Sequence, residues 1–310
     1  MKVLVTPTSL TPETPLPALK RLREVAEVQF SPARVPLAAS DLIPLLQDVD
    51  GVIAGLDDYS AAVIYGAGER LKVISRYGSG VDRVDLAAAR ERGIVVATTP
   101  GANAVAVAEL TLGLMFALAR GLPGLDRTVR AGQWPRRQGL EVTGKTLGIV
   151  GVGAIGTEVA VRAQGLGMTV LGYDPVVADD HLVALGIRPA GLHELLAESD
   201  VVTLHVPLLD TTRQLIDAAA LAAMKPGVLL INTARGGLID EAAAAEALRT
   251  GHLGGLALDA FAVEPPAGSP LFAYDNVILT PHTGAHTAEA VERMADAAVD
   301  NLLRVLLPER

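Results

Sequence analysis

Three residues in the second half of the chain could carry out acid–base and anion chemistry together. Arg235 follows the apolar run VLLINTA, Glu264 stands in the loop FAVEPP, and His282 follows NVILTP. A guanidinium presents two parallel N–H donors, which suit a carboxylate. An imidazole has an unperturbed pKa of about 6.5, and a neighbouring carboxylate favours its protonated form. These residue types predict a site that anchors a small acid and moves a proton.

Each of these residues also has a structural interpretation. Arg235 could pair with Asp240 or with a helix end. Glu264 could be loop surface, and His282 could be a hydrogen-bonded histidine at a strand end. With His286, His282 could instead suggest a metal site. We expect no metal, because the stretch HTGAH lacks the adjacent glutamate of a zinc-binding helix and the chain contains no cysteine.

A glycine motif is the strongest local signal. In TLGIVGVGAIGTEVA an apolar strand leads into Gly151, Gly153 and Gly156, and a helical stretch follows. The first glycine permits a tight turn, the second lets the backbone approach a pyrophosphate, and the third lets the helix pack closely on the strand. The amino terminus of the helix then holds the anion. The glycines alone could mark a turn, but in this context they predict a dinucleotide-binding site.

An acid at the end of the next strand indicates which dinucleotide is bound. Asp174, in TVLGYDP, can accept hydrogen bonds from both ribose hydroxyls of the adenosine half. A 2′-phosphate would meet like charge there, so NAD is favoured over NADP. Asp174 precedes Pro175 and could instead be a turn residue. Arg162 could favour NADP, but it belongs to the helix of the glycine motif, where we expect it to face solvent.

The nicotinamide half of a dinucleotide gives the glycine motif and the three ionisable residues a common reaction. It moves hydride to or from a carbon whose oxygen must gain or lose a proton. We therefore predict that His282 is the acid–base residue, Glu264 its carboxylate partner and Arg235 the anchor of a 2-keto acid. Asp259 and His205 also stand at strand ends on this edge, where His205 could merely line the site.

Short β-branched runs alternate with Ala- and Leu-rich stretches of helical spacing, which predicts an α/β fold with parallel sheets. Five strand-like runs precede residue 100, and about six more begin at residue 146. The carboxyl ends of parallel strands share one edge, where ligands of doubly wound sheets bind. The stretch 103–122, with Asn103 as its cap, is expected to form a connecting helix, and 285–307 a helix that returns to the first sheet.

This pattern predicts two doubly wound domains. Residues 1–98 together with 284–310 are expected to form a discontinuous substrate-binding domain, and residues 99–283 an NAD-binding domain. Each series of strands is sufficient for one parallel sheet of its own.

Composition restricts the partners. Of the 310 residues 50% are hydrophobic and 20% charged, and the net charge of −9 argues against nucleic acid. The densest basic stretch, RAGQWPRR, is expected to be a solvated turn. The longest apolar stretch, AVAVAELTLGLMFALA, contains Glu109 and is shorter than the about 20 residues that cross a bilayer, so we expect no membrane contact. The absence of cysteine is compatible with the cytoplasm, which is the predicted location.

The sequence resembles the D-isomer-specific 2-hydroxyacid dehydrogenase family over nearly its whole length. The resemblance is carried by SRYGSGVDRVDL, GKTLGIVGVGAIG, GYDP, LHVPL, MKPGVLLINTARGGLIDE, ALDAFAVEPP and LTPHTGAHT. It is strongest to short-form phosphoglycerate dehydrogenase-type members. It implies a Rossmann NAD-binding domain, a smaller flavodoxin-like substrate domain, D stereochemistry and a homodimer formed mainly through the NAD-binding domain.

The resemblance also implies roles for individual residues. Arg235, Glu264 and His282 match the catalytic residues, and Arg235 and His282 also contact the substrate. Asp259 matches an aspartate that binds the nicotinamide carboxamide. The implied cofactor-binding positions are Gly151, Gly153, Ala154, Ile155, Gly156, Asp174, His205, Val206, Pro207, Thr233, Ala234, Asp259, His282 and Gly284. The substrate carboxylate is expected on backbone N–H groups of the loop Tyr77, Gly78, Ser79 and Gly80. A mobile cleft is expected to have hinges near Thr99 and Thr283.

The chain departs from the resemblance at one position that bears on the substrate. Phosphoglycerate dehydrogenases often carry a phosphate-binding arginine after the third strand of the first domain, where this chain has Gly55 or Leu56. Arg76 could replace it, as could Arg136 and Arg137 reaching across a dimer. These arginines could equally be surface charge.

The expected function is that of an NAD-dependent D-2-hydroxyacid dehydrogenase, which moves hydride between nicotinamide and C2 of a small 2-hydroxy or 2-keto acid. A glyoxylate or hydroxypyruvate reductase is the nearest alternative. An alternative from another class is an NADH-sensing binding protein, similar to related transcriptional corepressors that keep the same residues.

Overall fold

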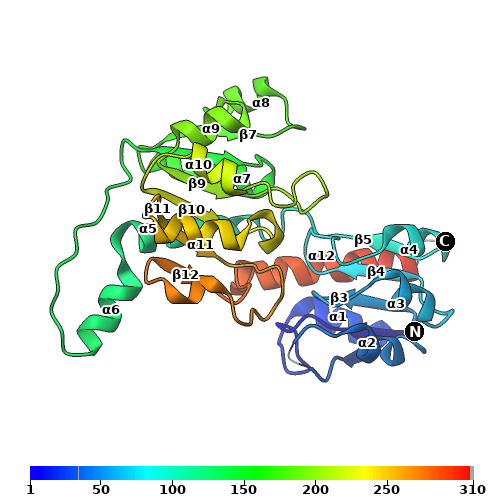
Figure 1. The fold of residues 1–310 in the computed structure, drawn as a ribbon. Coiled ribbons are helices and arrows are strands. Elements are labelled where there is room, and N and C mark those ends of the chain that lie inside the picture. Colours follow the sequence, from blue (N-terminus) through cyan, green and yellow to red (C-terminus); the bar gives the residue numbers. More distant parts are fainter. Residues whose placement is uncertain (34, 308–310) are drawn as a thin grey trace. The chain divides into compact units, whose positions relative to one another are not determined.

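The computed structural model describes residues 1–33 and 35–307. The chain folds into two compact units (Figure 1). Unit 1 comprises Met1–Asn103 and the described residues from His286 onward, and unit 2 comprises Ala104–Ala285. The sequence-based domain boundaries, after residues 98 and 283, lie close to the boundaries of these units. Each unit contains one parallel sheet with helices on both faces, so the predicted α/β class is confirmed.

Unit 1 contains a five-stranded sheet in the order β2-β1-β3-β4-β5, with every strand pair parallel. This is the 2-1-3-4-5 order of flavodoxin-like sheets, as the family resemblance implied. Its strands are β1 (Lys2–Val5), β2 (Glu27–Phe30), β3 (Gly51–Ala54), β4 (Val73–Arg76) and β5 (Val95–Ala97).

Alternating side chains decide which helices cover each face of this sheet. On β1, Val3 and Val5 join a core cluster with α1 and α12, whereas Leu4 joins a cluster with α2, α3 and α4. The helix α12 also contacts β3 and β4, so the predicted return of the last helix to the first sheet is confirmed. The helices of unit 1 are α1 (Pro17–Val25), α2 (Ala39–Leu45), α3 (Ala61–Gly66), α4 (Leu86–Glu91) and α12 (Ala288–Leu306).

Unit 2 contains a seven-stranded parallel sheet in the order β12-β11-β10-β9-β6-β7-β8. Counted from β6, this is the Rossmann order 3-2-1-4-5-6 with one further strand at an edge. The strands are β6 (Thr146–Val150), β7 (Thr169–Tyr173), β8 (Arg188–Pro189), β9 (Val201–Leu204), β10 (Val228–Asn232), β11 (Leu253–Leu258) and β12 (Val277–Leu279). The sequence predicted about six strands and missed β8, because two residues at a sheet edge carry no hydrophobic pattern.

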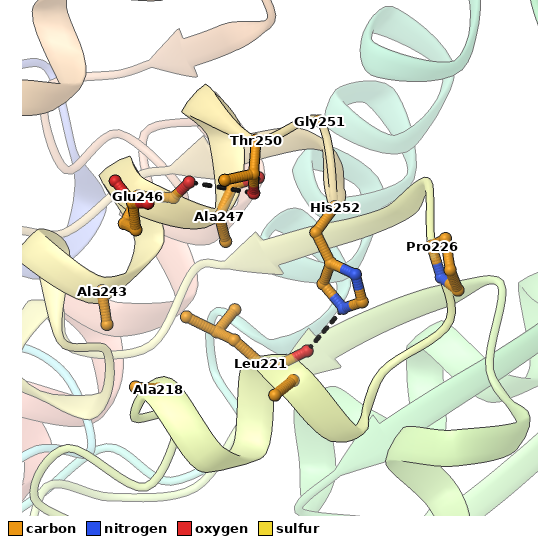
Figure 2. Close-up of a pocket in the computed structure, with 10 residues that line it drawn as sticks. Ala218, Leu221, Pro226, Ala243, Glu246, Ala247, Thr250, Gly251 and His252 are labelled. Atoms are coloured by element: carbon orange, nitrogen blue, oxygen red, sulfur yellow. Dashed lines mark hydrogen bonds between the residues drawn. The ribbon is translucent and has the colours of Figure 1, made fainter.

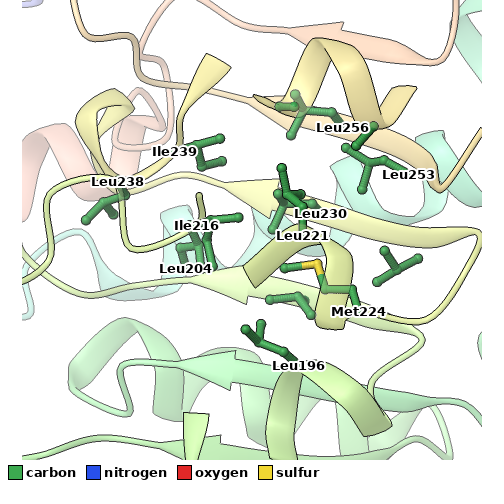
Figure 3. Close-up of a cluster of buried hydrophobic side chains, with 14 of the residues drawn as sticks. Leu196, Leu204, Ile216, Leu221, Met224, Leu230, Leu238, Ile239, Leu253 and Leu256 are labelled. Atoms are coloured by element: carbon green, nitrogen blue, oxygen red, sulfur yellow. The ribbon is translucent and has the colours of Figure 1, made fainter. Parts of the chain in front are cut away.

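Helices bury both faces of this sheet as well. One face packs on α5, α7 and α8, and the other on α9, α10 and α11. Figure 3 shows the second cluster, where Leu204 and Leu230 from adjacent strands lie near Leu221 and Met224 from the end of α10. The helices of unit 2 are α5 (Ala104–Arg120), α6 (Leu122–Arg130), α7 (Ala154–Gly165), α8 (Asp179–Ala184), α9 (Leu192–Glu198), α10 (Ala218–Ala223) and α11 (Glu241–Arg249), with 3-10 turns at Gly236–Leu238 and Pro270–Ala273.

The helix α6 was not predicted, and it differs sharply from α5 before it. Most residues of α5 facing the sheet are buried, whereas α6 contains no buried residue. Figure 1 shows α6 lying apart from the sheet of unit 2, and the extended segment after α6 returning to that sheet. No single described helix is long and apolar enough to span a bilayer; α5 and α6 meet that criterion only as a pair bent by 62°.

Candidate functional site

The carboxyl ends of six adjacent strands in unit 2 carry the sequence-predicted residues. In sheet order from β12 to β7 these are His282, Asp259 with Glu264, Arg235, His205, Gly151 and Asp174. Because all these strands are parallel, their carboxyl ends lie on one edge, where doubly wound sheets bind ligands. The chain reverses its order of strands between β6 and β9, at Gly151 and His205.

Close contacts require two of the three motif glycines, and the third borders open space. Gly151 has a φ of 96°, and a Cβ there would lie 2.7 Å from the carbonyl carbon of His205. At Gly156 a Cβ would lie 2.1 Å from the carbonyl oxygen of Gly151, so only glycine lets α7 approach the loop. At Gly153 no described atom lies within 4 Å of an added Cβ. The missing side chain at Gly153 therefore leaves space for a ligand at the start of α7.

The amino end of α7 and Asp174 meet at the glycine loop, where the dinucleotide is predicted to bind. Ala154 and Ile155 are the first residues of α7, where backbone N–H groups lack helical acceptors. The Asp174 carboxylate accepts the N–H of Val152, inside the glycine loop, at 2.9 Å. It also accepts the N–H of Val176 at 2.9 Å. These bonds hold the acid against the loop that is predicted to bind the pyrophosphate.

The sequence suggested that Arg162 faces solvent, but the structure shows a partly buried side chain in two ion pairs. Its side chain is 28% exposed and forms ion pairs with Glu158 on its own helix and with Glu109 on α5. Two carboxylates thus oppose its charge. The arginine contributes to packing between α5 and α7 rather than presenting an uncompensated cation to a 2′-phosphate.

His205 is a half-buried histidine whose imidazole is neutral. Its Nε2 lies 3.0 Å from the Thr203 hydroxyl, while its Nδ1 is buried without a hydrogen-bond partner among the described residues. Burial lowers the pKa of His205 to about 3, so the imidazole is uncharged near neutral pH. His205 therefore stands at this edge as a neutral side chain, and its cofactor contact stays a prediction.

His282 and Glu264, the predicted acid–base pair, lie in direct contact. The two side chains share a hydrogen bond of 2.8 Å between His282 Nδ1 and Glu264 Oε1. The Glu264 side chain is only 14% exposed, and its Oε1 also accepts the N–H of Phe261. Glu264 is therefore not loop surface. Because the carboxylate occupies Nδ1, Nε2 is the nitrogen through which His282 can exchange a proton with a ligand.

Asp259 holds the loop that carries His282. The carboxylate is 1% exposed and accepts hydrogen bonds from the Thr280 hydroxyl at 2.6 Å and from the N–H groups of Thr283 and Gly284 at 2.8 Å. His282 has a φ of 52°, which is uncommon for a residue with a side chain. Three bonds to one buried acid stabilise this conformation. The N–H of Gly284 is therefore already used within the protein, and the cofactor contacts of Asp259 and Gly284 stay predictions.

Asn232, which the sequence analysis did not single out, fixes the turn that carries Arg235. This amide is fully buried; its Nδ2 donates to the carbonyl oxygen of Arg235 at 2.7 Å, and its Oδ1 accepts the N–H of Ala234 at 3.0 Å. The sequence feature that could have identified Asn232 is a polar residue at the end of the apolar run VLLIN. Asp240, the suggested structural partner of Arg235, accepts N–H groups of Ala242 and Ala243 at the start of α11.

Backbone packing brings the Arg235 turn against the Glu264 loop. A Cβ at Gly236 would lie 2.1 Å from the carbonyl carbon of Phe261, so the two loops touch at this glycine. Thr233 is held from α5, where its hydroxyl lies 3.0 Å from that of Thr111. Of the other predicted cofactor contacts, Val206 is buried, Ala234 is half-buried and Pro207 is exposed.

In unit 1, the loop Tyr77–Gly80 offers fewer donors than predicted. The N–H of Tyr77 donates to the carbonyl of Ala54, and the N–H of Gly78 donates to the Thr99 hydroxyl. Both groups are therefore already used within the protein. Only the N–H groups of Ser79 and Gly80 lack a partner among the described residues, and the carboxylate-binding role of the loop stays a prediction.

Arg76 is neither surface charge nor an exposed phosphate ligand. The residue is 3% exposed, and its guanidinium donates to the carbonyl oxygens of Ala54 and Gly80. The position of the missing phosphate-binding arginine is also enclosed, because a Cβ at Gly55 would lie 3.1 Å from the Cα of Pro7. Arg136 and Arg137 lie in the exposed segment after α6.

A separate hollow of about 590 Å³ lies between α10 and α11, near the amino ends of β10 and β11 (Figure 2). Small side chains such as Ala218 and Ala243 leave this space, and the nearby polar groups are bonded within the protein. The Nε2 of His252 lies 2.9 Å from the carbonyl oxygen of Leu221. Among the described residues, no group of three or more His, Cys, Asp or Glu side chains could hold a metal ion.

Comparison with known proteins identifies similar sequences. A family model described as "D-isomer specific 2-hydroxyacid dehydrogenase, NAD binding domain" matches residues 112–284. A D-3-phosphoglycerate dehydrogenase from Methanocaldococcus jannaschii is 40% identical over 295 residues, which cover 94% of this chain and 56% of the relative. The chain spans about half the length of the curated relatives it matches.

Solved structures match the whole chain. The TT0316 protein from Thermus thermophilus is 43% identical with a TM-score of 0.87, and the match covers 99% of this chain and 97% of that one. A glyoxylate reductase from Paecilomyes thermophila is 29% identical with a TM-score of 0.87, and the match covers 99% and 96% of the two chains.

Two glycines of α7 provide a test of the dinucleotide site. Gly156→Ala should weaken NADH binding by about tenfold or more, because the new methyl group forces α7 away from the Gly151 carbonyl. Gly165→Ala is the matched control, since no described atom lies within 4 Å of its Cβ. Fluorescence titration with NADH measures both dissociation constants. Equal affinities for the two variants would show that the glycine loop does not bind the dinucleotide.

Proposed function

The chain belongs to the D-isomer specific 2-hydroxyacid dehydrogenase family, and we propose that it is an NAD-dependent oxidoreductase acting on the CH–OH group of a D-2-hydroxy acid. Hydride passes between the nicotinamide and C2 of a small 2-hydroxy or 2-keto acid. The observation that carries this proposal is the His282–Glu264 hydrogen bond, on the same sheet edge as the glycine loop and Asp174.

The residues of this edge suit reduction of a keto acid. When bound, NADH supplies the hydride to C2. His282 gives the proton from Nε2 to the former carbonyl oxygen, and Glu264 stabilises the imidazolium through Nδ1. Arg235 neutralises the acid and polarises its carbonyl. The products are the 2-hydroxy acid and NAD, and His282 regains a proton from solvent; oxidation follows the same steps in reverse.

Arg235→Gln tests the anchoring role. We expect kcat/KM for the best 2-keto acid to fall by the equivalent of about 2 to 5 kcal/mol, because a charged contact with the substrate is lost. Arg249→Gln is the control, since Arg249 pairs with Glu246 on the exposed side of α11. Steady-state rates with NADH provide the measurement. An unchanged kcat/KM in Arg235→Gln would remove Arg235 from the mechanism.

Two features favour a small, unphosphorylated substrate. Gly55 or Leu56 stands where phosphoglycerate dehydrogenases often carry a phosphate-binding arginine, and Arg76 is buried. With the similarity to a glyoxylate reductase, these features support glyoxylate or hydroxypyruvate reduction as the second candidate. The similarity to D-3-phosphoglycerate dehydrogenases supports a phosphorylated acid instead.

Reduction rates measured on glyoxylate, hydroxypyruvate, pyruvate and 3-phosphohydroxypyruvate separate these candidates. Tight NADH binding without turnover on any acid would favour the NADH-sensing alternative.

Asp174 supports NAD as the cofactor. Its carboxylate is held at the glycine loop, where the 2′-phosphate of NADP would meet negative charge, and Arg162 is already paired with two carboxylates.

Replacing the Asp174 carboxylate should weaken the preference for NADH over NADPH. In Asp174→Ala the ratio of kcat/KM for NADH over NADPH should fall by about tenfold or more, since one repulsive charge is removed. Asp179→Ala, which changes an exposed acid in α8, should leave the ratio unchanged. If Asp174→Ala keeps the wild-type ratio, another feature selects the cofactor.

We also propose a homodimer formed through unit 2. The exposed helix α6 and the segment after it present Leu122, Val129, Trp134 and Leu140 to solvent, with Trp134 81% exposed. Large apolar side chains gathered on one extension are typical of a surface that another protein covers. A second copy of this chain is the proposed partner.

Sedimentation velocity tests the dimer. Trp134→Glu should shift the protein toward the monomer, because a charge replaces the most exposed apolar side chain of the extension. Val183→Glu is the control, since Val183 is also an exposed apolar residue of unit 2, at 61%, but lies in α8. A Trp134→Glu protein that sediments like the wild type would contradict this interface.

Several further assignments remain predictions. They are the substrate-binding role of unit 1, the hinges near Thr99 and Thr283, the nicotinamide contacts of individual residues and a cytoplasmic location.

A further inference from the structure

Arg76 is a buried cation that joins a strand of unit 1 to the loop Tyr77–Gly80. It ends β4, is 3% exposed, and donates from Nη1 to the carbonyl oxygen of Ala54 at 2.8 Å. Its Nε donates to the carbonyl oxygen of Gly80 at 3.0 Å. Ala54 ends the neighbouring strand β3, so one guanidinium links the sheet to the far end of the loop.

The loop is also held at its other end. The N–H of Tyr77 donates to Ala54, and Gly78 exchanges two hydrogen bonds with Thr99, one to the hydroxyl at 2.9 Å and one from the backbone N–H at 3.0 Å. The two N–H groups without a described partner, those of Ser79 and Gly80, lie between these attachments. Neighbouring backbone N–H groups in a turn can form a concave anion-binding site.

A buried acid accompanies Arg76. Asp57 is 1% exposed and accepts hydrogen bonds from the N–H of Leu37 at 2.8 Å and from the Thr6 hydroxyl. Burial raises the pKa of Asp57, and the charge of Arg76 acts in the opposite direction. Thr6 also accepts the N–H of Gly55, so the network joins the carboxyl ends of β1 and β3. The order of strands in unit 1 reverses between these two strands, which is where doubly wound sheets bind ligands.

We propose that Arg76 is a positioning residue for the substrate carboxylate: its guanidinium holds the Ala54 and Gly80 carbonyls, and so fixes the loop that presents the Ser79 and Gly80 N–H groups. This role rests on the proposed function. Arginine suits it better than lysine, because a planar fork can reach two carbonyls in fixed directions whereas an ammonium cannot. Arg76 acts through the loop and does not touch the substrate.

Arg76→Lys keeps the charge and removes the fork. The control is Arg92→Lys, since Arg92 also donates to backbone carbonyls of unit 1, those of Ile64, Ala67 and Gly68, but lies after α4. In Arg76→Lys the amides of Tyr77 and Gly78 should exchange hydrogen about tenfold faster, because their hydrogen bonds open more often. Arg92→Lys should leave this exchange unchanged.

Activity supplies the second readout. The ratio of kcat/KM for a 2-keto acid over its neutral methyl ester should fall by about tenfold in Arg76→Lys, mainly through KM for the acid. The Kd for NADH should stay within about twofold, since NADH is proposed to bind unit 2. A purely structural role would lower acid and ester rates equally and keep the ratio, and that result would overturn the proposal. Unchanged exchange at Tyr77 and Gly78 would overturn it as well.

Two further measurements keep the test decisive. If Arg76→Lys does not fold, the double variant Arg76→Gln with Asp57→Asn removes both buried charges together, and the same two outcomes apply to it. If the wild type reduces no acid, the proposed function fails on its own; calorimetry with oxalate then tests the loop. Binding about tenfold weaker in the variant than in the wild type would support the positioning role, and equal binding would overturn it.

Discussion

The parallel direction of every strand is the constraint on which the candidate site depends. It brings the carboxyl ends of β12, β11, β10, β9, β6 and β7 to one edge of unit 2, so that residues from Gly151 to His282 can act on one dinucleotide and one acid. Antiparallel strands would send alternate ends to the opposite edge. The sheet thereby decides which residues can meet, and the loops beyond it decide how their side chains are directed.

Buried polar side chains control those loops. Asn232 holds the turn of Arg235, and Asp259 holds the loop of His282. In unit 1, Arg76 is bonded in the same manner to Gly80. A buried polar group without a partner is costly, so each of these residues strongly favours the one loop conformation that satisfies it. Buried polar residues can therefore determine the geometry of the loops that carry the predicted ligand-binding residues.

The two histidines on this edge show how environment separates residues of the same type. His205 is half-buried, has no neighbouring carboxylate in its hydrogen bonds and has its pKa lowered to about 3, so it stays neutral. His282 is partly exposed, and its Nδ1 shares a hydrogen bond with the Glu264 carboxylate. Only His282 combines access to a ligand with a partner for its second nitrogen. This difference supports the proposal that His282 transfers the proton.

The sequence by itself determined the α/β class, the two series of strands and the pairing of Glu264 with His282, because hydrophobic periodicity and strand-end positions are local properties of the chain. It also indicated the glycine loop and Asp174. Only the tertiary structure decided that Arg76 is buried, that Asn232 supports Arg235, and that two of the four loop N–H groups are already used. Those outcomes depend on which distant backbone groups come within hydrogen-bonding distance after packing. A linear pattern of residues does not contain that information.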